Sequence, residues 1–463
     1  MKRLVTALVL SVMAGVSALA DTGALDVHDV VAIALERNPA LKAIEERLAE
    51  LDGGIREARS DAFPQVALRS SWSQNRNPSL LNSPDFEEII DLFPGFEPGT
   101  QELYNVSLEL SQPLLTSGKV GSAVELAKIA VDIGDMQIET AKLDTAALAA
   151  EAYYRVLEAR EGLAAIEIQQ QTRRESLAVV NARFEIGEAT ELERLQAEAA
   201  LAELQPVVDT ARGRVTVTEI DLRAVLDLPE RAALAVDDLS TPLPGLPAQE
   251  AAFTFALEHR PEFEDLELQI AALGAQRKIT KADGYPRVDL TGAYGHTVRL
   301  LEDIDSSRFQ DWNVAVGLSW EIYDGGRRQG QISQLESQGL QLEWQLAALR
   351  NRVRQEIESA LSDYQTALSR WSASKISARA AREASRVAGE SYTEGVAIQA
   401  DWLSAQEREI DAEVVLVQAY YSAQIGAARL SRALGLRADE AWNLETHNRT
   451  DEDETVESRG ENS

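Results

Sequence analysis

Ala34-Leu35-Glu36-Arg37-Asn38-Pro39 occurs a second time, as Ala256-Leu257-Glu258-His259-Arg260-Pro261. An aromatic-proline pair follows each copy, Phe63-Pro64 in the first and Tyr285-Pro286 in the second. Both matches have the same offset of 222 in residue number, from 39 to 261 and from 64 to 286. Similarity at a fixed spacing is the signature of a repeated structural unit. The sequence therefore predicts that the chain consists of two structural repeats with the same fold.

Further matches continue through both halves at a second constant offset, of 208 in residue number. They pair Val106–Ser111 with Val314–Ser319, Gly118 with Gly326, Phe184–Gly187 with Tyr392–Gly395, and Leu226–Leu228 with Leu434–Leu436. The change from 222 to 208 falls inside one loop, which is 14 residues longer in the first half, so one insertion keeps every match in register. We expect a first repeat at 21–240 and a second at 248–447. The linker 241–247 is rich in proline and glycine, which exclude helix and central strand.

Both ends of the chain lie outside these repeats. Lys2 and Arg3, an apolar stretch from 4 to 16 and the triplet Ala18-Leu19-Ala20 make up the three parts of a secretory signal peptide. We therefore expect residues 1–20 to be removed and the mature protein to be exported. Residues 448–463 are acidic and polar with almost no large apolar side chain, which predicts a disordered tail.

Composition excludes several classes of function. The 45 Lys and Arg residues against 76 Asp and Glu give a formal net charge of −31, which repels nucleic acid. The same charge suggests an aqueous interior that favours cations over anions. Cysteine is absent, which excludes disulfides, thiolate metal sites and cysteine nucleophiles. The four histidines are isolated, and no phosphate-binding glycine loop or nucleophile elbow occurs. We expect no enzyme, no cofactor and no metal site.

Each half predicts the same layout of a helix, a strand, a loop, a second strand and a very long helical stretch. In the first half Asp26 can cap a helix with an apolar side formed by Val30, Ile33, Ala34, Ile44 and Leu48. The loop from Arg76 to Gln101 carries four prolines, and a loop of that length suits the outside of an outer-membrane barrel.

The clearest strand is Trp312-Asn-Val-Ala-Val-Gly-Leu-Ser-Trp320. Trp312, Val314, Val316, Leu318 and Trp320 alternate there with small or polar residues, and Trp72, Val106 and Leu108 show the same alternation in the first half. Strict alternation with aromatic residues at both ends is typical of a barrel strand that faces lipid on one side. An ordinary half-buried antiparallel sheet gives the same pattern. The strand pattern alone does not separate the two.

The stretches 119–226 and 327–434 contain one proline, Pro206, and are rich in strong helix formers. Apolar residues with coiled-coil spacing run through the second: Leu403, Ile410, Val414, Val417, Tyr421 and Ile425. Gly187 and Gly395 can each turn the chain back, which gives arms of roughly 60 and roughly 40 residues. The longer arm would measure on the order of 90 Å, as a helical tube requires. Four strands cannot close a membrane barrel, so other chains must contribute strands if this sheet spans a membrane; three copies would supply twelve.

This ordered set of motifs resembles the TolC-like outer membrane efflux family. The motifs are Ala34-Leu35-x-x-Asn38-Pro39-x-Leu41, Phe63-Pro64, Gln112-Pro113-Leu114, Phe184-x-x-Gly187, Tyr323-Asp324-Gly325-Gly326, Tyr392-x-x-Gly395, Ala405-Gln406 and Ala433-Leu434-Gly435. The resemblance implies a mainly α protein with a small β part, assembled as a homotrimer. Its twelve strands would form a transmembrane β-barrel in the outer membrane. Its long antiparallel helices would form a coiled-coil barrel across the periplasm, with a mixed belt around the middle.

The resemblance also implies the function. The chain would be the exit duct of a tripartite efflux pump or a type I secretion system. Its partners would be a periplasmic adaptor and an inner-membrane pump of the RND or ABC type, and its surroundings outer-membrane lipid. The alternative is a soluble periplasmic coiled-coil scaffold or adaptor without channel activity, whose helices would look the same. Four amphipathic strands with tryptophans favour the channel. The transported substrate cannot be predicted from this sequence.

In the TolC-like family an aromatic and acidic side chains hold a periplasmic aperture shut. The resemblance assigns the aromatic to Tyr392, the main acidic ring to Asp401 and its first-half equivalent to Glu193. It makes Gly187 and Gly395 the turns at the helical tips, where an adaptor docks. The chain departs from the family pattern at Ala397, where an arginine is frequent, and at Ser404, where a second aspartate is frequent. The sequence therefore leaves open how the aperture is closed.

Overall fold

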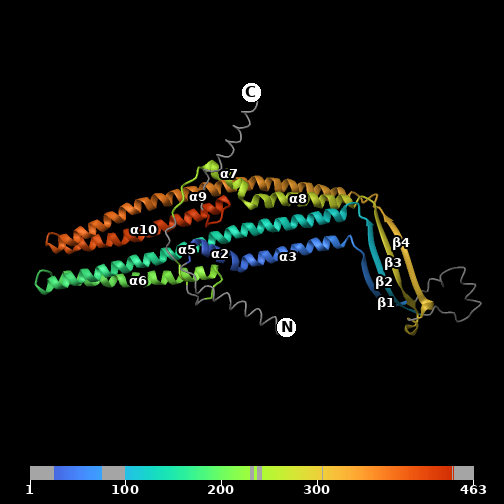
Figure 1. Ribbon diagram of the computed structural model, residues 1–463, viewed down its shortest axis with the longest axis horizontal. Coiled ribbons are helices and arrows are strands. Elements are labelled where there is room, and N and C mark those ends of the chain that lie inside the picture. Colours follow the sequence, from blue (N-terminus) through green and yellow to red (C-terminus); the bar gives the residue numbers. More distant parts are fainter. Residues whose placement is uncertain are drawn as a thin grey trace, which may run out of the picture. The chain divides into compact units, whose positions relative to one another are not determined.

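The computed structural model describes residues 25–75, 100–229, 234–236, 242–304, 306–440 and 442. The predicted signal peptide 1–20, most of the loop between the first two strands and the tail 448–463 lie outside these residues. The chain is mainly helical with one small sheet, as predicted (Figure 1). It divides into two compact units, and each unit takes segments from both halves of the sequence. Among the described helices, none is both long enough and apolar enough to cross a membrane.

The first unit, residues 47–134 and 266–344, contains the sheet. Its strands are β1 (Gln65–Asn75), β2 (Gln101–Leu115), β3 (Arg287–Val298) and β4 (Gln310–Ser319). All neighbours are antiparallel and lie in the order β1-β2-β3-β4, so β1 and β4 are the edges (Figure 1). Two short 3-10 helices, η2 (Leu301–Asp303) and η3 (Ser307–Phe309), lie between β3 and β4. Four strands per chain were predicted.

Strand register separates an apolar face of the sheet from a polar one. Leu68 pairs with Leu108, Leu108 with Tyr294, and Tyr294 with Trp312, so these side chains form one row across all four strands. On the other face, Arg69 forms a 2.7 Å ion pair with Glu109. The apolar row is nevertheless exposed, with Leu68 73% and Trp312 70% accessible in the single chain. An apolar face of this kind marks a surface that another apolar phase or partner covers.

In each half, two shorter helices precede the strands. They are α2 (Val27–Arg37) and α3 (Pro39–Ser60) in the first half, and α7 (Gln249–His259) and α8 (Pro261–Ala282) in the second. Asp26 caps α2 as predicted, because its carboxylate accepts a hydrogen bond from the Asp29 N–H at 2.8 Å. The single helix predicted to run from Asp26 through Leu48 is wrong. Asn38 has an extended ψ of 119°, since the residue before a proline disfavours helical geometry.

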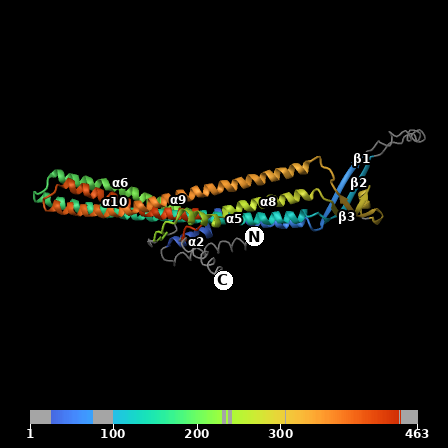
Figure 2. The ribbon, with the colours of Figure 1, turned by 90° about the horizontal axis from the view of Figure 1, so that it is seen from above.

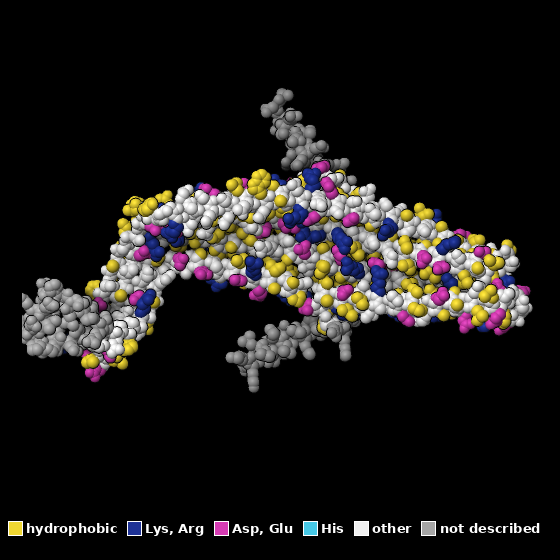
Figure 3. All heavy atoms as spheres, turned by 180° about the vertical axis from the view of Figure 1, so that it is seen from behind, with side chains coloured by type: hydrophobic (Ala, Val, Ile, Leu, Met, Phe, Trp, Pro, Cys, Tyr) yellow, Lys and Arg dark blue, Asp and Glu magenta, His cyan; other side chains and the backbone are white. Residues whose placement is uncertain are grey.

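The long stretches fold into two helical hairpins (Figures 1 and 2). The first joins α5 (Lys119–Glu185, 67 residues) to α6 (Glu191–Val225, 35 residues). The second joins α9 (Arg327–Thr393, 67 residues) to α10 (Gln399–Leu434, 36 residues). Each stretch thus divides into a longer and a shorter arm, close to the predicted proportions. Figure 3 shows charged side chains of both signs interspersed with apolar ones over the helices.

In the second unit, residues 25–46, 135–265 and 345–442, α2 and α7 pack against the long helices. Val30, Val31 and Ala34 of α2 share a buried core with residues of α5, among them Ala146, Ala149, Ala150 and Tyr153. Ala252 and Ala256 of α7 share another with α9 and α10 residues, among them Val353, Ile357, Tyr364 and Leu430. Alanine at these positions lets the helix backbones approach closely, which is why α2 and α7 pack tightly against the long helices.

Candidate gating site at the helical tips

The first hairpin turns at Gly187, whose φ is +78°. Such a conformation strains residues with a Cβ atom and favours glycine. The Gly187 N–H donates to the Phe184 carbonyl at 3.0 Å, and the Glu188 N–H donates to the Arg183 carbonyl at 2.8 Å. These bonds satisfy the last carbonyls of α5 and end the helix. Gly187 is therefore a helical-tip turn, in the place predicted for it.

The second hairpin turns at Gly395 with the same backbone bonds. Gly395 has a φ of +76°, its N–H donates to the Tyr392 carbonyl at 3.0 Å, and the Val396 N–H donates to the Ser391 carbonyl at 2.8 Å. Each of these positions follows its counterpart in the first hairpin by the same offset, as Gly395 follows Gly187. The two tips therefore share one backbone geometry, and they differ only in side chains.

A capping box fixes the start of α6. The Thr190 hydroxyl accepts a hydrogen bond from the Glu193 N–H, and the Glu193 carboxylate accepts one from the Thr190 N–H at 2.6 Å. This arrangement satisfies two backbone donors at the helix start. The predicted aperture residue Glu193 thus has its carboxylate occupied by local hydrogen bonds. The corresponding α10 has Ile398 at the N-cap, with no side-chain cap.

Arg183 connects the two hairpin tips. Its guanidinium, on the last turn of α5, donates to the carbonyls of Tyr392 at 2.6 Å and Thr393 at 3.0 Å, at the end of α9. It also stands 4.9 Å from the centre of the Tyr392 ring. A cation at the C-terminus of a helix interacts favourably with the partial negative charge of the unpaired carbonyls. Arg183 is therefore bound by both the backbone and the aromatic ring of the second tip.

A second polar contact joins the same tips. Gln399, 2% exposed at the start of α10, donates from its side-chain amide to the Glu193 carbonyl at 2.8 Å. Farther along the hairpins, buried Gln406 donates to the Ser176 hydroxyl at 2.7 Å. Buried hydrogen bonds with a side-chain donor are costly to break when the donor is left without an acceptor. These contacts hold the first hairpin against the second.

Tyr392 occupies the centre of this contact. It is buried among Val180, Ala189 and Ala197 of the first hairpin and stacks on Trp402, with ring centres 5.4 Å apart. Its hydroxyl is buried and has no hydrogen-bond partner among the described residues. Burial raises the pKa of the Tyr392 hydroxyl, the charge of Glu193 raises it further, and Arg183 acts in the opposite direction. Tyr392 therefore stays neutral at physiological pH and acts by packing.

The other two predicted aperture residues lie on α10, away from this cluster. Asp401 is exposed on the first turn, and its carboxylate has no hydrogen bond or ion pair within the described ranges. Ser404 lines a separate cavity of about 610 Å³ that also includes Arg173, Glu203 and Glu407. The single chain thus brings Tyr392 and Glu193 together and leaves Asp401 free to face another molecule. The aperture assignments of these residues remain predictions.

Sequence reasoning missed Arg183, Gln399 and Trp402. Arg183 corresponds by the repeat offset to Ser391, so the two halves differ at the position that forms the contact. The repeat places an arginine in the first half where the second half has a serine, close to the glycine turn in each. This difference in charge is the one sequence signal that could have identified Arg183. Gln399 donates to a backbone carbonyl, and such acceptors leave no trace in sequence.

The predicted lipid-facing residues lie on the apolar face of the sheet. Val314, Val316 and Leu318 are each about two-thirds exposed, and register aligns them with Gly292, Leu290 and Val288 of β3. Trp72 and Leu108 are also exposed, and Val106 is half-buried on the same face. Trp320 lies just beyond the end of β4, where its indole N–H donates to the Gly284 carbonyl at 3.0 Å. Contact of these side chains with lipid remains a prediction.

The described residues contain no cluster of histidine and acidic side chains that could hold a metal ion. What they do contain is a sheet with an exposed apolar face and two helical tips joined by Arg183 and Gln399.

The family described as outer membrane efflux protein matches residues 30–227 and 254–436 of this chain. Outer membrane efflux protein BepC of Brucella suis biovar 1 (strain 1330) is 26% identical over 441 residues, which cover 94% of this chain and 90% of that protein. Outer membrane protein TolC of Escherichia coli (strain K12) is also 26% identical, over 456 residues that cover 94% and 87%.

A solved structure, the open state of the Neisseria gonorrhoeae MtrE outer membrane channel, superposes with a TM-score of 0.72. It is 21% identical, and the match covers 90% of each chain. At that identity the structure supports the likeness of fold alone. The family match, by contrast, spans most of the chain in two segments, one in each half of the sequence.

Proposed function

Because the chain belongs to the outer membrane efflux protein family, we propose that it forms the exit duct of a tripartite efflux pump or a type I secretion system. It lies in the outer membrane, extends into the periplasm and conducts substrates passively to the exterior. The chain is not an enzyme, and energy comes from its inner-membrane partner. Efflux relatives such as BepC support this function. The soluble scaffold, the alternative open from sequence, has no support from them.

The sheet is the observation that carries the proposal. One of its faces is apolar and exposed, and the outer edges of β1 and β4 have no partner strand among the described residues. In lipid every backbone polar group must be satisfied, so an open sheet edge cannot persist there. Three copies that join β4 of one chain to β1 of the next would close a barrel of twelve strands. The apolar face would then contact outer-membrane lipid.

The hairpin tips form the gate of this duct. The family pattern predicts a closing cation at the position of Ala397, and this chain instead places Arg183 beside Tyr392. Arg183 supplies the missing positive charge from the other hairpin. Its bonds to the carbonyls of Tyr392 and Thr393 hold the two hairpins of one chain together. Opening then requires these bonds to break.

Asp401 forms the constriction itself. Its carboxylate is exposed and has no partner within the described chain, and three copies around a narrow pore would concentrate negative charge that binds cations. The periplasmic adaptor docks at the turns of Gly187 and Gly395. It belongs to a pump of the RND or ABC type.

Single-channel recording in planar bilayers tests this function, with wild type compared with Asp401→Ala. We expect small, cation-preferring currents that trivalent cations block, and loss of the block in the variant. Glu394→Ala, which removes an exposed carboxylate beside the same tip, is the matched control and should keep the block. Absence of any insertion would return the protein to the soluble scaffold class. If both proteins insert and trivalent cations block them equally, the channel is supported but its constriction is formed by residues other than Asp401.

A further inference from the structure

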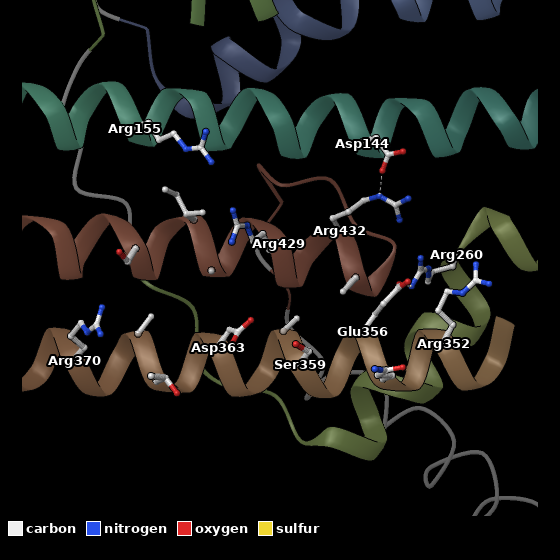
Figure 4. Close-up of a pocket in the computed structure, with 18 residues that line it drawn as sticks. Asp144, Arg155, Arg260, Arg352, Glu356, Ser359, Asp363, Arg370, Arg429 and Arg432 are labelled. Atoms are coloured by element: carbon white, nitrogen blue, oxygen red, sulfur yellow. Dashed lines mark hydrogen bonds and ion pairs between the residues drawn. The ribbon is translucent and has the colours of Figure 1, made fainter. Parts of the chain in front are cut away.

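A groove of about 980 Å³ with arginine-rich walls lies between α5, α9 and α10 in the helical unit (Figure 4). Six arginines line it, five from α5, α9 and α10 and one, Arg260, from the junction of α7 and α8: Arg155, Arg260, Arg352, Arg370, Arg429 and Arg432. The gate and the sheet do not involve this groove. Its composition contrasts with the chain as a whole, whose formal charge is −31.

Four of these arginines are paired with carboxylates. Arg260 bonds to Glu262 and Glu356, and Arg432 bonds to Asp144 and Glu262. Arg155 and Arg429 share Glu151. These pairs hold the guanidinium groups of the groove in fixed positions.

The remaining two arginines are unpaired. Neither Arg352 nor Arg370 has a hydrogen bond or ion pair with any residue in the described ranges. One buried N–H group of Arg432, at its Nη1 atom, also lacks an acceptor. Counting Asp363, five carboxylates line the groove or pair into it against six arginines. The groove therefore carries a net positive charge and unused donors, and both favour an anion.

The groove lies beside the C-terminal end of α7, where Arg260 enters its lining, and it uses a different stripe of α9 from the one that packs on α7. On α9 the stripe of Val353, Ile357 and Tyr364 shares a core with α7. Arg352, Asp363 and Arg370, with the spacing of one helix face, form a different stripe that lines the groove. The stripe that packs on α7 is apolar and buried, so a water-filled duct would use the charged stripe.

We propose that this groove is an anion-binding site on the wall of the duct, and that it takes solutes with two or more carboxylates. The proposal rests on the proposed function, because it identifies the wall with the side that faces the duct. Guanidinium groups bind carboxylates through paired hydrogen bonds, and a groove concentrates their field. A polyvalent anion that passes through the duct would therefore bind at this groove, although the rest of the chain is acidic. The sequence had suggested an interior that favours cations throughout.

Carboxylates could also come from residues 443–463 of the chain itself, which contain Asp451, Glu452, Asp453 and Glu454. Trp442, the last described residue, argues against this source. It packs edge-on against Tyr364 with ring centres 5.8 Å apart, and its indole N–H donates to the Gly245 carbonyl at 2.9 Å. Tyr364 belongs to the stripe that packs with α7, so Trp442 contacts that stripe and not the one that carries Arg352 and Arg370. A solute is therefore the favoured occupant.

Calorimetric titration of citrate into the purified full-length protein at low ionic strength tests the site. We expect wild type to bind citrate and the double variant Arg352→Gln/Arg370→Gln to bind it about fivefold more weakly, since exposed charge pairs contribute modestly. Both arginines are exposed and unpaired within the described chain, so their loss leaves no buried carboxylate behind. Arg350→Gln/Arg379→Gln removes the same charge from exposed positions of α9 outside the groove and should match wild type.

Three outcomes would overturn the proposal. The first is no citrate binding by wild type, and the second is equal weakening in both double variants. The third is a large gain in affinity when the chain is ended after Trp442, which would make residues 443–463 the occupant. Potassium chloride currents recorded on the same samples report channel formation separately. Loss of citrate binding with intact currents rejects the anion site alone, and absent currents reject the duct.

Discussion

At the scale of single residues, Arg183 joins the two hairpin tips, and we propose that it replaces the closing cation expected at Ala397. Its guanidinium is one-fifth exposed and is bound by two carbonyls and one aromatic ring of the opposite hairpin. Hydrogen bonds from a charged donor contribute roughly 1.5–3 kcal/mol when they are partly buried. Under the proposed function, this contact favours the closed arrangement of the tips, and adaptor docking breaks it.

Arg183→Gln is expected to raise the resting conductance of the channel severalfold, because the tips lose their charged connection. Arg183→Lys keeps the charge but offers a single point donor in place of the planar fork, so its conductance should be intermediate. Arg174→Gln is the control, since among the described residues Arg174 bonds only within its own helix. Single-channel recording measures all three. Equal conductance in Arg183→Gln and Arg174→Gln would show that Arg183 does not hold the gate.

Tyr392 should act through its ring, and its hydroxyl should be dispensable. The hydroxyl has no partner in the described chain, so Tyr392→Phe is expected to leave resting conductance and thermal stability unchanged. Tyr392→Ala removes the ring from Trp402 and Arg183 at a cost of about 3–5 kcal/mol and should open the channel. Burial raises the pKa of this hydroxyl, so wild-type conductance should not change from tyrosine ionisation between about pH 6 and 9. Opening by Tyr392→Phe would mean that a neighbouring copy binds the hydroxyl.

At the scale of elements, ion pairs at the start of α8 connect it to neighbouring helices. Pro261 starts α8, and the charged residues on either side of it join α8 to α9 and α10. Burial alone would raise the pKa of Glu262, but the adjacent Arg260 and Arg432 lower it to about 2. A carboxylate that ionises more easily in the folded state stabilises that state when it is charged.

Glu262 should therefore give the fold a pH dependence with a definite sign. Its folded pKa lies below the unfolded value, so its contribution is complete above about pH 4.5 and is lost as the pH falls toward 2. The shift corresponds to on the order of 3 kcal/mol. Glu262→Gln lacks this contribution and leaves Arg260 without one of its partners.

Denaturation of the helical signal at several pH values measures the effect. The gap in apparent stability between wild type and Glu262→Gln should be largest near pH 7 and should narrow below pH 4. Glu264→Gln, on the same helix but without an ion pair among the described residues, serves as the control. A gap that stays constant with pH would mean that the two arginines do not depress the pKa of Glu262.

At the scale of the whole molecule, the sequence predicted the four strands and the two long helical hairpins, because periodicity determines them. Alternation over Trp312–Leu318 predicted a strand, and the paired glycines Gly187 and Gly395 predicted the hairpin turns. The break at Asn38 was missed, since apolar spacing continued across it. The repeat spacing does not reveal the two compact units, because each unit combines segments from both halves.

The candidate sites were predictable only where side chains follow a pattern. Tyr392 could be assigned because a motif surrounds it, whereas Arg183 binds backbone carbonyls that any residue provides. The arginine groove was missed for a similar reason. Its members are spread along the sequence from Arg155 to Arg432, and only the packing of α5 beside α10 brings them together. Long-range contacts of this kind leave no periodic signal in one sequence.

The sheet allows a test of the whole assembly with two neighbouring residues. Val316 and Ala315 are adjacent on β4, and their side chains point to opposite faces because strand residues alternate. Val316 belongs to the apolar face, which we place in lipid, and Ala315 to the polar face, which we place toward water. An arginine on the lipid face costs about 2–4 kcal/mol near the bilayer midplane. Three copies would multiply this cost within one barrel.

Val316→Arg should therefore abolish insertion into the outer membrane, while Ala315→Arg should insert and conduct. Detergent extraction of membrane fractions and single-channel recording measure the two properties separately. Both variants add the same charge to the same strand, so a general loss of folding would affect them equally. If Val316→Arg inserted as well as Ala315→Arg, the apolar face would not contact lipid. The exposed row of Leu68, Leu108 and Trp312 would then have to be covered by protein, which would make the sheet an interface and not a membrane barrel.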